Sequence, residues 1–155
     1  MLYPFLLLLH SWLRWLVVLS SVVVLARSAQ GAWAGRTFSP LDRRLGALFL
    51  SALDTQVLLG LVLYFFVSPL TPRSLSDVRA FMPVAPLRFF AVEHIFGMLV
   101  ALAAAHVGWA RGKRAPTDTA RHRRIAIGVG LAVLAIVVSI PWPGLRYARP
   151  LLRMP

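Results

Sequence analysis

The chain has no cysteine and few acidic residues, and each shortage excludes particular kinds of site or classes of protein. The absence of Cys among 155 residues excludes disulfides, thiolate metal sites, cysteine-ligated iron–sulfur clusters and covalent c-type haem attachment. Asp and Glu number only five, against 17 Lys and Arg, and charged residues are 14% of the total. A soluble domain of this length carries a larger charged fraction.

Signatures of hydrolytic and phosphate chemistry are also missing. The serines have no nucleophile-elbow or triad context, and there is no Gly-rich phosphate loop. A three-ligand zinc site is conceivable from His10, His94 and Glu93. However, no H-E-x-x-H pattern supports it, and the site would be buried in lipid. The sequence favours an electron carrier or a subunit over a stand-alone enzyme.

What the chain does contain is apolar sequence in long runs. Hydrophobic residues are 59% of the total, and four runs approach the roughly 20 residues that a membrane-spanning helix needs. We place the spans at about residues 3–26, 45–67, 87–110 and 125–140. The alternation of apolar and polar side chains that a membrane β-barrel requires is absent. We therefore expect helices, because free backbone N–H and C=O groups cannot be satisfied in hydrocarbon. We therefore predict an all-α integral membrane four-helix bundle that forms one domain over residues 1–155.

Two loop features add detail to this prediction. Ser39-Pro40-Leu41-Asp42 has the residue types of a helix start before the second span. Between the second and third spans, prolines interrupt the chain, and residues 74–82 are predicted to form a short surface helix.

The basic residues lie almost entirely at the span ends, which argues against nucleic-acid binding and for topology signals. The first and third loops hold ten of them: Arg27, Arg36, Arg43, Arg44, Arg111, Lys113, Arg114, Arg121, Arg123 and Arg124. The other side holds six: Arg73, Arg79, Arg88, Arg146, Arg149 and Arg153. We predict a multi-pass protein of a bacterial cytoplasmic membrane with both termini periplasmic, in which the basic loops contact anionic lipid headgroups.

Polar residues inside the spans are the candidate functional residues, because ionisable groups in a membrane are costly. His10 and His94 each lie about seven residues into parallel spans, so both should sit roughly 10 Å below the outer boundary. Two histidines at one depth on different helices suit the axial ligation of a b-type haem. Arg14, one turn from His10, would pair with a haem propionate or with Asp54.

The remaining candidates extend this site or form another. Asp54, Gln56 and Glu93 are predicted to join a buried polar cluster with the two histidines and Arg14. His106 and His122, near the cytoplasmic ends of their spans, would approach one another as a less favoured second site. His94 and His106 are rotated by about 120° on an ideal helix, which weakens a second haem.

Other interpretations of the same residues stay open. His10 and His94 could be interior histidines hydrogen-bonded to neighbouring helices, or part of a proton or ion path. Small residues on the last two spans, which would let helices or a flat cofactor approach closely, are as follows: Gly97, Ala101, Ala104, Ala105, Gly108, Gly128, Ala132, Ala135 and Ser139.

Four segments carry a resemblance to a known group of proteins. They are residues 10–17 (HSWLRWLV), 59–65 (LGLVLYF), 88–94 (RFFAVEH) and 139–143 (SIPWP). With them the chain resembles small four-span bacterial membrane proteins described as cytochrome b-like or uncharacterised. The resemblance implies a membrane-embedded redox role through haem b, with His10 and His94 as the matching residues.

Together these patterns predict a b-type haem electron-transfer protein of a respiratory-type chain. Its partner would be a quinone or another membrane subunit. The alternatives are a non-catalytic accessory subunit of a larger membrane complex, and a proton or ion pathway.

Overall fold

The computed structural model describes residues 2–152, apart from the side chain of Leu75, and contains helices and no strand within that range. The long helices are α1 (Leu2–Ala34), α2 (Pro40–Val62), α5 (His94–Lys113) and α6 (Asp118–Ser139). A π-helical turn, η1 (Leu63–Val67), extends α2, and another, η2 (Phe89–Glu93), leads into α5. Two short helices, α3 (Leu75–Phe81) and α4 (Ala85–Arg88), lie between these turns. Arg153, counted above among the basic residues, lies outside the described range.

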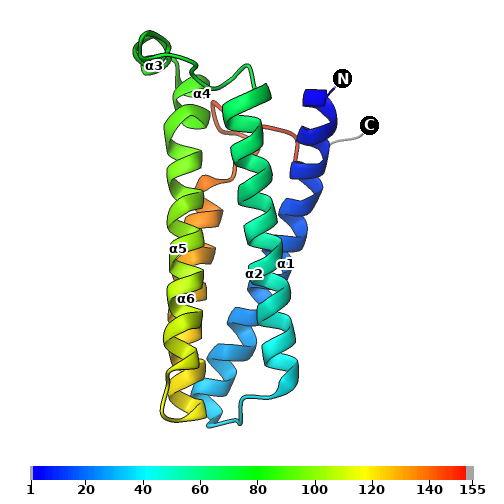
Figure 1. The fold of residues 1–155 in the computed structure, drawn as a ribbon, viewed down its shortest axis with the longest axis vertical. Coiled ribbons are helices and arrows are strands. Elements are labelled where there is room, and N and C mark those ends of the chain that lie inside the picture. The colour runs from blue at the N-terminus through cyan, green and yellow to red at the C-terminus, as the bar shows by residue number, and fades with distance from the viewer. Residues whose placement is uncertain (1, 153–155) are drawn as a thin grey trace.

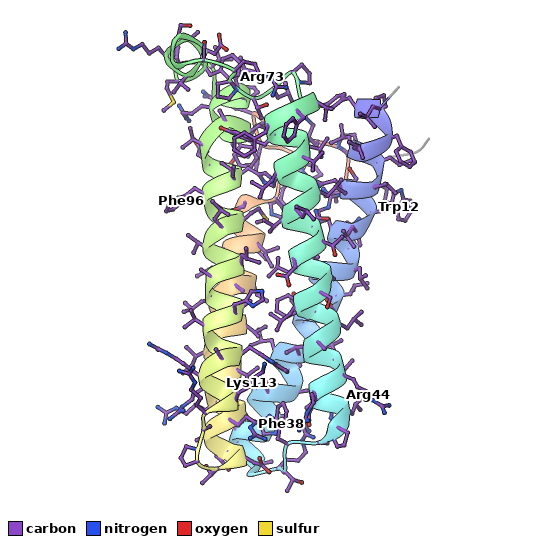
Figure 2. All side chains as sticks on the ribbon, in the orientation of Figure 1. Trp12, Phe38, Arg44, Arg73, Phe96 and Lys113 are labelled. Carbon is purple, nitrogen blue, oxygen red and sulfur yellow. The ribbon has the colours of Figure 1, made fainter. Side chains whose placement is uncertain are left out.

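The four predicted spans are confirmed as helices that are long and apolar enough to cross a membrane. They cover Leu2–Ala34, Pro40–Val67, Ala85–Lys113 and Asp118–Ser139, and each exceeds its apolar run because the helix continues into polar flanking sequence. Leu58 and Phe96 expose 64% and 67% of their surface. In Figure 2 the side chains of Trp12 and Phe96 point away from the bundle. Such a large apolar surface suits contact with lipid chains.

The helices form an antiparallel bundle in which α1 packs on α2 and α6, and α5 packs on α6 and α2. Figure 1 shows the N- and C-terminal ends of the chain at one end of the bundle, with α3 and α4. The α1–α2 and α5–α6 connections lie at the opposite end. Figure 2 places Arg44 and Lys113 near that opposite end and Arg73 at the other. The predicted grouping of the first and third loops is therefore present in the fold.

The connection between α1 and α2 is fixed by the sequence signal that predicted it. The Ser39 side chain accepts a hydrogen bond from the Asp42 backbone N–H, and the Asp42 carboxylate accepts one from the Ser39 backbone N–H. This capping box satisfies N–H groups that the first helical turn leaves free. Asp42 is buried and also accepts hydrogen bonds from Arg27 and Arg36. The hydrogen bond from Arg36 to the Asp42 carboxylate raises the pKa of Arg36 above its ordinary value.

The closest approach between helices is the crossing of α5 and α6 at two glycines. A Cβ atom added to Gly108 would lie 2.6 Å from the Gly128 Cα. A Cβ on Gly128 would lie 2.7 Å from the backbone oxygen of Ala104. Because these neighbours are backbone atoms, they cannot move aside by a change of rotamer. The predicted small-residue stripes thus act in helix packing, as is common in membrane bundles.

Because α5 crosses α6 at Gly128, we expect Gly→Ala substitutions at Gly128 and Gly130 to differ in their effect on stability. Gly128→Ala should destabilise the protein by about 1–3 kcal/mol through overpacking. Gly130→Ala is the matched control, because its Cβ would meet only Leu25 Cδ1, at an ordinary 3.7 Å. That variant should be neutral or slightly stabilising, since Ala favours helix over Gly. Thermal unfolding of both variants in the same detergent is the measurement, and equal midpoints would contradict the proposed contact.

Candidate functional site

His10 of α1 and His94 at the start of α5 come together, as the depth argument predicted. Their ring centroids are 6.2 Å apart and the ring planes are inclined at 71°. Gly60 of α2 provides the room for His10, because a Cβ there would lie 3.2 Å from the imidazole Cε1. The two imidazoles therefore meet inside the bundle, near the end that holds the termini.

A backbone carbonyl fixes the tautomer of His94. Its Nδ1 lies 2.8 Å from the Ser139 carbonyl oxygen on α6. Since a carbonyl only accepts, Nδ1 must carry the proton, and Nε2 of the neutral ring then holds a lone pair. Gly97, one turn after His94, allows this contact, because a Cβ there would overlap the Ser139 side chain. This is the arrangement that typically orients a histidine ligand toward a metal.

The two π-helical turns lie beside this histidine and are joined to each other. The Tyr64 hydroxyl of η1 donates a hydrogen bond of 2.8 Å to the Ala91 carbonyl of η2. The second turn ends immediately before His94. π-Helical turns inside longer helices are often found at functional sites. The sequence carried no signal for either turn.

Both histidines line a cavity of about 320 Å³ at the centre of this half of the bundle. Its wall is mainly aliphatic and aromatic, and its polar lining includes His10, Arg14, Gln56, His94 and Arg149. Three buried polar atoms of these residues have no hydrogen-bond partner in the described part of the chain: His10 Nδ1, Arg14 Nε and Gln56 Oε1. Buried polar atoms are normally paired. The cavity thus has a polar region that a bound group or water would satisfy.

The C-terminal segment after α6 borders this cavity and contributes Pro141, Arg149 and Pro150 to its lining. Trp142 to Leu152 runs across the end of the bundle toward α1 (Figure 1). The Leu151 carbonyl accepts hydrogen bonds from the Arg14 guanidinium and, at 3.0 Å, from Trp15 Nε1. Tyr147 stacks on Phe89 with ring centroids 3.8 Å apart. Sequence reasoning missed this role, because only the Pro141 helix stop was visible in the pattern.

The predicted pairing of Arg14 with Asp54 is wrong. Asp54 Oδ1 lies 2.7 Å from His106 Nε2 instead, and both side chains are about half exposed on the outside of the bundle. The reason is rotational: Gln56 points inward and donates to the His10 carbonyl at 3.0 Å, whereas Asp54, two positions earlier, lies about 200° away around α2.

The wider predicted cluster also divides. Glu93 pairs with Arg88 at 2.7 Å, and both side chains are 42% exposed, so Glu93 does not join the histidines. Of the six residues predicted to gather, the cavity brings together His10, Arg14, Gln56 and His94. Asp54 and Glu93 belong to separate surface pairs.

The predicted approach of His106 to His122 is also wrong, because the two residues face different helices. His106 bonds to Asp54 on α2. His122 is fully buried, with its ring 5.1 Å from that of Phe38 and packed where a Cβ of Gly31 would stand. In the described residues neither of its ring nitrogens has a partner.

Loss of the Arg14 side chain should loosen the C-terminal segment. A hydrogen bond from a charged group contributes about 1.5–3 kcal/mol, so Arg14→Ala should raise the rate of trypsin cleavage after the exposed Arg146 by about tenfold or more. Arg44→Ala, at the other end of the bundle (Figure 2), is the control and should leave that rate unchanged. Equal rates in both variants would mean that Arg14 does not hold the segment.

Comparison with known proteins adds no relative to this description. No protein-family model matches the chain, and no curated protein or solved structure matches it either. The resemblance to cytochrome b-like four-span proteins therefore stays a prediction. The chemistry of the site rests on the side chains described above.

Proposed function

We propose that this protein is a membrane-embedded, b-type haem-binding electron carrier. The observation that carries the proposal is the facing pair of His10 and His94 at the wall of a central cavity. Imidazole nitrogens bind a metal at about 2 Å, so two rings on opposite sides of one iron have centroids roughly 6 Å apart. The separation of 6.2 Å between the His10 and His94 ring centroids is close to that value.

The rest of the donor set fits haem as well. His94 presents its Nε2 lone pair because Nδ1 donates to Ser139. The cavity volume, about 320 Å³, is within the range of ligand sites. Arg14 and Arg149 line the same cavity and supply the positive charge that propionate carboxylates require. His10 Nδ1 is buried and has no hydrogen-bond partner among the described residues, so in the tautomer protonated at Nε2 its lone pair would be available to iron.

In this proposal the protein's residues hold the cofactor, and the iron supplies a one-electron change when bound. His10 and His94 would hold the iron from two helices, the Ser139 carbonyl would orient His94, and the apolar wall would exclude water. The C-terminal segment, anchored by Arg14, forms part of the cavity wall. Electrons would pass to a quinone or a redox subunit in a bacterial cytoplasmic membrane.

The test is the absorption spectrum of the protein purified from cells supplied with a haem precursor. We expect a dithionite-reduced α-band in the unmodified protein and its loss in the His10→Ala, His94→Ala double variant. His106→Ala is the matched control, because that histidine lies outside the cavity lining and its loss should leave the band intact. Size-exclusion profiles identical to that of the unmodified protein would show that the variants are folded.

Two results would overturn the proposal. One is a protein that is monodisperse yet has no reduced α-band. The other is a band that persists in the double variant, which would place the haem elsewhere.

A further inference from the structure

A polar pair lies on the outer surface of the bundle, half-way along a candidate span. Asp54 is at the centre of Pro40–Val67, and its carboxylate and the His106 ring are 50% and 48% exposed. In a single chain surrounded by lipid, both groups would contact acyl chains. Ionisable residues at that depth almost always face other protein or a water-filled space. The pair therefore requires a cover that one copy of the chain does not provide.

Small residues surround this pair on both helices. Ala47, Ser51 and Thr55 follow one another at intervals of four on α2, and all three are exposed. Ala103 and Ala110 are exposed on α5, one turn before and after His106. Small residues permit another helix to approach closely, and polar groups hydrogen-bond across such contacts. We call the surface formed by these five residues and the Asp54–His106 pair the α2–α5 face.

We propose that a second copy of this chain docks on the α2–α5 face. The face is self-complementary, because it carries one acid and one imidazole side by side, 2.7 Å apart. Two copies in one membrane have the same orientation, so a two-fold axis along the membrane normal brings the pairs together at equal depth. Asp54 of each copy then meets His106 of the other, as an isologous interface requires.

The hydrogen-bonding capacity of the pair supports this occupant. The bond between Asp54 Oδ1 and His106 Nε2 uses one carboxylate oxygen and one ring nitrogen. Asp54 Oδ2 and His106 Nδ1 take no part in that bond, and the two-fold axis would bring Oδ2 of one copy toward the imidazole of the other. Thr55 adds no unsatisfied donor, because its hydroxyl donates to the Ser51 carbonyl at 2.8 Å. The proposal does not depend on haem.

The absence of cysteine makes a direct test simple. A single Ser51→Cys substitution in native membranes should give a disulfide-linked dimer on oxidation with copper phenanthroline. Leu131→Cys is the control: it lies half-way along α6, away from the α2–α5 face, and is 55% exposed, so it should give little or no dimer. The mass of the cross-linked product identifies what lies opposite Ser51.

A second measurement tests the interface without cross-linking. Ser51→Leu places a bulky group in the small-residue stripe, and we expect it to lower the dimer fraction in lipid nanodiscs about three- to tenfold. Ala26→Leu, on an exposed position of α1, is a matched small-to-large control that should leave the fraction unchanged. To show that each variant chain is still folded, its thermal unfolding midpoint should equal that of the monomeric form of the unmodified protein.

Three outcomes would overturn the proposal. A cross-linked product that contains a different protein would assign the face to a partner subunit. The absence of any product at Ser51 would leave the pair facing lipid. A dimer that Ser51→Leu and Ala26→Leu weaken equally would place the interface elsewhere.

Discussion

The close approach of α5 and α6 is the constraint on which the rest of the bundle depends. Glycines at 108 and 128 bring the two backbones into contact, and Gly97 keeps the helices together further along, at Ser139. Only at that separation does the Ser139 carbonyl reach the His94 ring. A packing requirement thus determines the orientation of a candidate ligand.

The bundle has two halves with different contents. Towards the loop end, Trp109 packs against Phe38, and His122 fills the space beside Gly31, so the interior is occupied. Towards the termini there is a cavity, and the C-terminal segment after α6 forms part of its wall. Among the described residues, buried polar atoms of His10, Arg14 and Gln56 that have no partner line this cavity, and the two unpaired ring nitrogens of His122 lie in the packed half. Unpaired buried polar groups are costly, and the cavity has room for water or a ligand that would restore their bonds.

The two proposals concern different surfaces of one molecule and answer the same physical question. Polar groups in a membrane need partners, and here they face either inward to the cavity or outward to the α2–α5 face. The inward group meets a cofactor in the first proposal, and the outward pair meets its own copy in the second. A dimer would place two such carriers side by side in the plane of the membrane.

Sequence by itself determined the four spans, the capped start of α2 and the common depth of His10 and His94. Each of these follows from local composition and from counting residues along parallel helices. Counting residues along a helix gives the depth of a side chain but not the direction in which it points. The predicted Arg14–Asp54 pair was wrong for that reason. Only the tertiary structure decided that Gln56 faces inward, that Asp54 meets His106 and that Leu151 reaches Arg14. These contacts depend on how each helix is turned against its neighbours, and that rotation is set by the packing of the whole bundle.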